Sequence, residues 1–103
     1  MYEEKKLCLE SYTLQNRRIY RLTEMMARDP AQKEKYAQEI QRAHLIRKSI
    51  EEKIAQTDGD VLSELLYLKY VCGKTLEEIA AILNYSERHT ERLHQKALKH
   101  FPL

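Results

Sequence analysis

The stretch TLEEIAAILNYSERHTERLHQKAL, residues 75–98, reads as two short helices with almost no chain between them. Thr75 followed three residues later by Glu78 forms a capping box, a pattern that opens a helix. We expect that helix to end near Leu83, because the polar residues after it interrupt the apolar pattern. Ser86 is a good N-cap for the second helix. The stretch therefore predicts a helix, a tight turn and a second helix.

The spacing within this stretch matches a helix-turn-helix. Such a unit needs a small residue where its helices cross, a turn residue that tolerates left-handed geometry, and inward-facing positions on the second helix. Ala80 is the small residue, and Asn84 suits the left-handed turn position. Thr90 and Leu93 fall at the inward positions. The remaining apolar contacts are expected from Leu76, Ile79, Leu83 and Tyr85.

The last helix, expected to run from Ser86 to near Phe101, has two opposite faces. At about 100° per residue, Arg88, Arg92, Gln95 and Lys99 share one face, and Thr90, Leu93, Ala97 and Phe101 share the opposite, apolar face. Glu91 lies near one edge of the basic face and Lys96 on its other flank. The charged outer face of an amphipathic helix usually contacts only solvent. Here the preceding short helix and tight turn are expected to project that face away from the rest of the domain. The first turns of the last helix are then free to enter a DNA major groove, where Arg bonds guanine and Gln reads adenine.

Two segments before this unit are expected to end helices, namely RDP at 28–30 and QTDGD at 56–60. Helices are predicted over roughly 3–28 and 31–56, since the residue before proline is disfavoured in a helix. Their apolar stripes are Cys8, Tyr12, Gln15, Ile19, Leu22 and Met26 in the first, and Tyr36, Ile40, Ala43, Arg47, Ile50 and Ile54 in the second. Two such helices predict an antiparallel hairpin with a coiled-coil-like seam.

The composition favours an all-α protein. The 103 residues include only two glycines and two prolines, and 33% of them are charged. A further helix is expected over VLSELLYLKYVCGK, with Asp60 as its N-cap and Gly73 as its terminator. The predicted organisation is a helical hairpin over 1–57, used for packing, oligomerisation or partner binding, and a three-helix DNA-binding domain over 58–103.

Other function classes find little support. No H-E-x-x-H pattern and no glycine-rich phosphate loop is present, so we predict no catalytic residue, no metal and no cofactor. For His89 and His94, which flank the reading face, a DNA contact and plain solvent exposure stay open, and His44 is expected to be structural or exposed. Cys8 and Cys72 have no metal or disulfide pattern and are expected to be small buried apolar residues. No signal peptide or membrane span is evident, so we expect a cytoplasmic protein.

The C-terminal part of the chain resembles a known protein family. TLEEIAAILNYSERHTERLHQKALKHF, preceded by LLYLKYVCGK, resembles the fourth conserved region of bacterial sigma factors, the domain that reads the promoter's upstream hexamer. The resemblance covers residues 58–103. Short versions joined to an N-terminal helical segment are similar to phage late-gene regulators of the ArpU and RinA kind. Nothing in residues 1–57 resembles the sigma domain that melts DNA, so a complete initiation factor is not expected.

The resemblance implies roles for individual residues. Thr75 and Lys96 match phosphate contacts, and Arg88, Glu91 and Arg92 match base-reading positions. Together with the face described above, the expected DNA-binding residues are Thr75, Glu87, Arg88, His89, Glu91, Arg92, Gln95, Lys96 and Lys99. Glu87 and Glu91 are acidic where the family often has Arg, so the preferred sequence is expected to differ from the standard hexamer. Thr90 replaces the usual Ile or Val, which should loosen the inner packing slightly.

The function expected from the sequence is a duplex-DNA-binding transcriptional regulator, encoded by a phage or prophage. The net charge of +2 is too small to indicate this alone, so the expectation depends on where the charge lies. Alternatives are an RNA polymerase-binding module acting through residues 1–57, or a small phage packaging (terminase) subunit. Double-stranded DNA is the expected partner, RNA polymerase an open one, and a membrane is not expected. The uncovered hairpin seam leads us to expect a homodimer.

Overall fold

The computed structural model describes residues 2–103, which contain helices and no strand. This confirms the all-α fold class. In chain order the elements are α1 (Glu3–Arg28), a 3₁₀ turn η1 (Pro30–Gln32), α2 (Lys33–Ala55), α3 (Asp60–Leu66), a π-helical turn η2 (Tyr67–Val71), α4 (Leu76–Leu83) and α5 (Glu87–His100).

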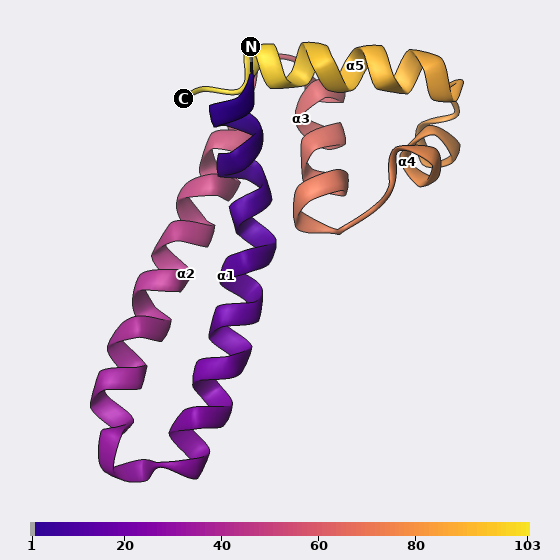
Figure 1. The fold of residues 1–103 in the computed structure, drawn as a ribbon. Coiled ribbons are helices and arrows are strands. Elements are labelled where there is room, and N and C mark those ends of the chain that lie inside the picture. Colours follow the sequence, from indigo (N-terminus) through magenta and orange to yellow (C-terminus); the bar gives the residue numbers. More distant parts are fainter. Residues whose placement is uncertain (1) are drawn as a thin grey trace.

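The two long helices run antiparallel and side by side, and the three shorter helices gather at one end of them (Figure 1). We call residues 3–55 the long pair and the end that carries the shorter helices its base. The molecule is elongated, at 52 × 25 × 22 Å, with a radius of gyration of 16.1 Å. A compact domain of about 100 residues has a radius near 13 Å. The excess reflects the far half of the long pair, which extends away from the rest.

The main core lies at the base, where residues of α1, α2, α3, η2 and α5 meet. It therefore draws on both sides of residue 57. Its buried members are Leu9, Tyr12, Ile50, Ile54, Leu62, Leu66, Tyr70, Ala97, Leu98 and Phe101. Because Ala97 and Leu98 of α5 and its C-cap Phe101 are among these residues, the orientation of α5 is fixed by the same core that closes the long pair.

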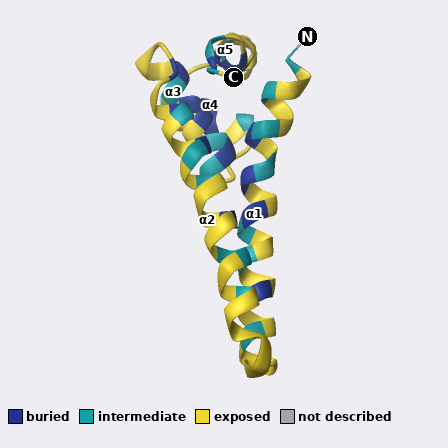
Figure 2. Ribbon diagram, turned by 90° about the vertical axis from the view of Figure 1, so that its left-hand side faces the viewer, coloured by how far each residue is buried: buried dark blue, intermediate teal, exposed yellow. Residues whose placement is uncertain are grey.

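Beyond the core, the seam of the long pair thins towards its far end. Gln15, Leu22 and Ala43 are buried along it, whereas the tip around η1 is exposed (Figure 2). Polar contacts cross the seam in its middle. The Tyr12 hydroxyl donates to Glu51 at 2.7 Å, and the half-buried Arg47 guanidinium donates to Asn16 at 2.6 Å. Arg47 also donates to His44, on its own helix, at 2.9 Å.

Several expectations about burial were wrong. Leu9 takes the fully buried position that the predicted stripe gave to its neighbour Cys8, which is half-buried. Cys72 is exposed rather than buried, because it lies at the end of η2 where the chain leaves the core. Ile19 and Ile40 are only half-buried, since the shorter helices do not reach that part of the seam.

The third helix also differs from its prediction. Gly59 precedes it as the N-cap, with φ 103°, so Asp60 is its first helical residue. The helix does not continue regularly to Gly73 but widens into the π-turn η2. Gly73 follows the turn with φ 73°, a left-handed value that suits glycine, and the chain then turns towards α4. The widened turn holds Tyr70, which is buried against α5.

Candidate nucleic-acid interface

Two capped helices form the unit predicted from residues 75–98. The Thr75 hydroxyl accepts from the Glu78 amide at 3.1 Å, and the Glu78 carboxylate accepts from the Thr75 amide at 3.1 Å. This reciprocal capping box, which begins α4, is confirmed. The amide of Thr75 lowers the pKa of the Glu78 carboxyl because it stabilises the charged form. The Ser86 hydroxyl caps α5 with a single hydrogen bond, which it accepts from the His89 amide at 3.1 Å.

The turn between α4 and α5 has the predicted left-handed residue. Asn84 has φ 60° and ψ 43°. The backbone amides of Asn84 and Tyr85 donate hydrogen bonds to the carbonyls of Ala81 and Ala80 in α4. Tyr85 itself was expected to face inward but is 40% exposed, with its ring edge-on to His89 at 4.9 Å between centroids. The turn therefore places two aromatic rings on the surface at the start of α5.

The inner face of α5 holds the unit on the core. Ala80 of α4 and Thr90 of α5 are buried at 3% and 0% exposure, which confirms both as inward positions. The Thr90 hydroxyl donates to the Ser86 carbonyl at 2.9 Å, so this buried polar group has a partner within its own helix. At the other end, the Lys5 ammonium donates to the Lys99 carbonyl at 2.8 Å, where a cation complements the carboxyl end of a helix.

The outer face of α5 is exposed along its length. All of the expected DNA-binding residues are exposed: Thr75, Glu87, Arg88, His89, Glu91, Arg92, Gln95, Lys96 and Lys99. Four of them, Arg88, Glu91, Arg92 and Gln95, line one shallow pocket of about 460 Å³ together with Leu76 and His94. The structure thus brings the central members of the set together, while the other five lie outside this lining.

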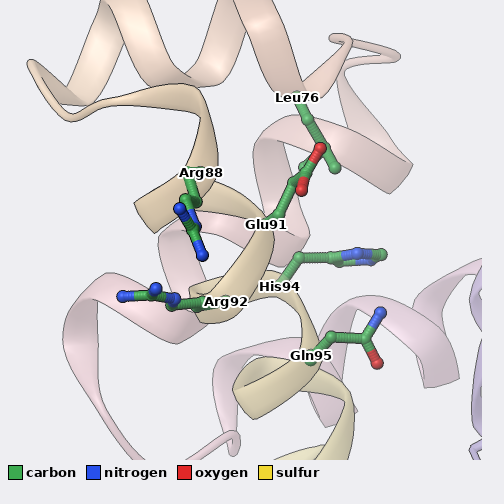
Figure 3. Close-up of a pocket in the computed structure, with 6 residues that line it drawn as sticks. All are labelled: Leu76, Arg88, Glu91, Arg92, His94 and Gln95. Carbon is green, nitrogen blue, oxygen red and sulfur yellow. The ribbon is translucent and has the colours of Figure 1, made fainter.

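Within the pocket the side chains separate by direction (Figure 3). Arg88 and Arg92 extend together from one side of α5, and Glu91, His94 and Gln95 point to the other. The two guanidinium groups are therefore presented as a pair, free of the neighbouring carboxylate of Glu91. An exposed pair of this kind suits bidentate hydrogen bonding to guanine or to phosphate.

The position of His94 agrees with neither of the two roles expected from the sequence, a DNA contact or plain solvent exposure. His94 is 6% exposed, and its Nε2 lies 2.7 Å from the Tyr70 hydroxyl. Burial, with a smaller contribution from the nearby Lys69 and Lys6 ammonium groups, lowers the pKa of His94 to about 4. The ring is therefore neutral at pH 7. Burial raises the pKa of Tyr70 to about 12, so the phenol keeps its proton and can donate it to the ring.

The Tyr70–His94 contact joins η2 to the middle of α5, behind the reading face. Sequence spacing could not reveal it, because the two residues are 24 positions apart and Tyr70 lies in an irregular turn. Two lysines were missed for a related reason. Lys6 and Lys69 line a second pocket, of about 640 Å³, that shares Leu76, His94 and Gln95 with the first. Nothing in the sequence near either lysine indicates this proximity.

A cluster of metal-ligating side chains and a membrane-spanning helix are both absent from residues 2–103. The His, Cys, Asp and Glu side chains of these residues do not gather in groups of three or more that could hold a metal ion. In the same residues, no helix combines the length and the apolar character needed to cross a membrane.

Comparison with protein families gives one match relevant to this geometry. Residues 62–100 match the family model described as sigma-70, region 4. Comparison with curated proteins and with solved structures gives no significant match. The matched residues run from α3 to the end of α5 and include the whole α4–turn–α5 unit. Residues 62–100 are therefore a sigma region 4-like helix-turn-helix domain, a class of domain that binds DNA.

Proposed function

We propose that this protein is a sequence-specific, duplex-DNA-binding transcriptional regulator that reads the major groove with α5. One observation carries the proposal: Arg88 and Arg92 lie together on the exposed face of a helix that a capped turn and a buried inner face hold in place. A recognition helix needs this combination of rigid support and free base-reading side chains. The region 4 match supports the same conclusion from the sequence pattern.

The individual roles follow from position and chemistry. Arg88 and Arg92 are proposed to contact bases, with Gln95 and Glu91 at the edge of the contact. Lys96 is proposed to contact phosphate. Glu87, His89 and Lys99 are proposed to lie along the flanks of the contact. A carboxylate accepts a hydrogen bond from cytosine N4, so Glu91 would favour a site unlike the promoter hexamer.

Thr75 is proposed as a phosphate contact through its hydroxyl. Its backbone amide already donates a hydrogen bond to the Glu78 carboxylate, so it is not available to a phosphate. The hydroxyl accepts from the Glu78 amide and keeps its own hydrogen to donate. The contact therefore differs from a bare helix terminus, where the amide itself would bind the anion.

The remaining parts of the proposal concern context. From the sequence resemblance to ArpU and RinA regulators alone, we propose a phage or prophage gene and a cytoplasmic site of action. A homodimer is proposed because the long pair leaves large apolar side chains exposed: Leu7 and Leu14 on α1, and Leu45 and Ile46 on α2, at 41–61%. The hairpin over 1–57 and the domain over 58–103 are proposed as the functional divisions.

A binding titration against salt tests the proposal. Arg92→Ala should relax discrimination by about 1–3 kcal/mol at the base pair that it reads. Lys96→Ala should weaken binding to every sequence alike and lower the slope of log affinity against log salt by about one. Lys35→Ala is the control, since Lys35 is exposed at the far end of the long pair. Parental binding by both α5 variants would show that α5 is not the reading element.

The exposed apolar residues of the long pair also favour a second candidate, a module that binds RNA polymerase. Leu45 and Ile46 line an apolar pocket with Cys8 and Ile50, which could receive a protein side chain. Capture of purified polymerase at a salt concentration that abolishes DNA binding would support this function. The mass of the free protein in solution separates a monomer, a dimer and the ring expected of a packaging subunit.

A further inference from the structure

A groove leads from the reading face of α5 towards α1. It begins at the pocket of Arg88 and Arg92 and continues, through Leu76, His94 and Gln95, into the second pocket. The far wall of the second pocket is formed by Lys6, Glu10 and Thr13 of α1, and Lys69 and Tyr70 of η2 complete it. The long pair therefore borders the proposed DNA surface directly, although it lies outside the matched residues 62–100.

The α1 side of this groove continues along the helix as a basic surface. Arg17 follows Thr13 by four residues, and Arg21 follows Arg17 by four, so the three lie on one side of α1. Arg17 and Arg21, with Leu14 and Arg18, line a further surface pocket. All three arginines are exposed.

We propose that α1 is a second DNA-contacting element, in which Lys6, Arg17 and Arg21, with Lys69 of η2, bind the phosphate backbone of the duplex beside the major groove that α5 enters. The inference rests on the proposed function and extends its footprint. A helix in the major groove has a phosphate backbone on each flank, and the groove lies on the flank towards which Glu91 and Gln95 point.

The dimensions and charges suit this occupant. Lys6 and Arg21 are fifteen residues apart on a continuous helix, which places them about 22 Å apart along its axis. That length corresponds to about six base pairs at 3.4 Å each. The ammonium groups of Lys6 and Lys69 both lie close enough to His94 to disfavour its protonation, so the groove carries concentrated positive charge. Glu10 is the carboxylate in the lining, and it should weaken phosphate binding there.

The test compares two double variants that each remove two positive charges. Arg17→Gln with Arg21→Gln removes the proposed contacts, and Lys33→Gln with Lys35→Gln removes exposed lysines at the far end of the long pair. A duplex that the parent protein binds is first identified by selection. Each protein is then titrated with this duplex at several salt concentrations. The arginine variant should lower the slope of log affinity against log salt by about two, because each lost phosphate contact contributes about 0.9. The lysine variant should keep the parental slope.

A third variant and a second duplex sharpen the result. Glu10→Gln should bind more tightly than the parent, since a carboxylate facing the backbone is removed. Extending the duplex by about ten base pairs on the α1 side should strengthen binding by the parent and not by the arginine variant. Equal slopes for the arginine variant and the parent, while Arg92→Ala still relaxes discrimination, would overturn the inference and leave the proposed function intact. Absence of duplex binding by the parent would refute both.

Discussion

The buried His94 ring makes folding stability dependent on pH. Its pKa is lowered from 6.5 to about 4 in the folded chain, so folding favours the neutral ring. The neutral ring contributes its full stabilisation above about pH 6.5, and this contribution decreases as the pH falls from there towards 4. In that range His94 becomes protonated in the unfolded chain but stays largely neutral in the folded chain. The Lys69 and Lys6 ammonium groups oppose the same protonation.

The size of the effect follows from the shift in the pKa. Between pH 7.5 and pH 5.0, a change from 6.5 to about 4 corresponds to about 2 kcal/mol of unfolding free energy. His94 borders three solvent-open pockets, so screening reduces the expected loss to about 1–2 kcal/mol. A loss of this size is a large part of the stability of a small domain, which is typically 5–15 kcal/mol in total.

The assay is urea unfolding followed by circular dichroism, at pH 7.5 and pH 5.0, for the parent and for His94→Gln. The variant lacks the titrating ring but keeps every carboxylate, so acid effects from groups such as Glu78 are common to both proteins. The parent should lose about 1–2 kcal/mol more than the variant. Equal losses, or a His94 ring that titrates near pH 6.5 by nuclear magnetic resonance, would refute the reasoning from burial.

Three further predictions concern the elements that position α5. Thr75→Ala should cost about 1 kcal/mol of unfolding free energy through loss of the capping box; an unchanged urea midpoint would contradict this. Asn84→Ala should cost about 1–2 kcal/mol because φ is 60°, whereas Asn84→Gly should be close to neutral, and equal effects of the two would show that the left-handed turn is not retained. Phe101→Ala should cost about 3–5 kcal/mol, measured in the same way, and a cost below 1 kcal/mol would be inconsistent with its complete burial.

The C-terminal helices were predictable because their signals are local. Thr75, Glu78, Asn84 and Ser86 act within three or four residues of themselves, so their caps and turn could be read without knowledge of the rest of the chain. The amphipathic division of α5 is local for the same reason. The bounds of α1 also agreed closely with the prediction, since proline at residue 30 limits the helix that precedes it.

What the sequence missed depends on contacts between distant segments. Leu9, rather than Cys8, faces the core because α3 and α5 cover the base of the long pair from a direction that a two-helix seam does not specify. Tyr70 of η2 contacts His94 of α5, and the π-turn that positions Tyr70 has no local sequence signal that we could identify. Lys6 approaches the reading face only because α1 packs against η2 and its first turns lie beside α5.

The central claim is that the outer face of α5 reads base pairs. It is tested most directly by selecting bound sequences from a randomised duplex pool with the parent and with Arg92→Ala. If α5 reads base pairs, the parent should yield a reproducible motif, and the variant the same motif with reduced preference at the position that Arg92 contacts. Recovery of an identical motif by both proteins, or recovery of duplexes without any motif by the parent, would contradict it.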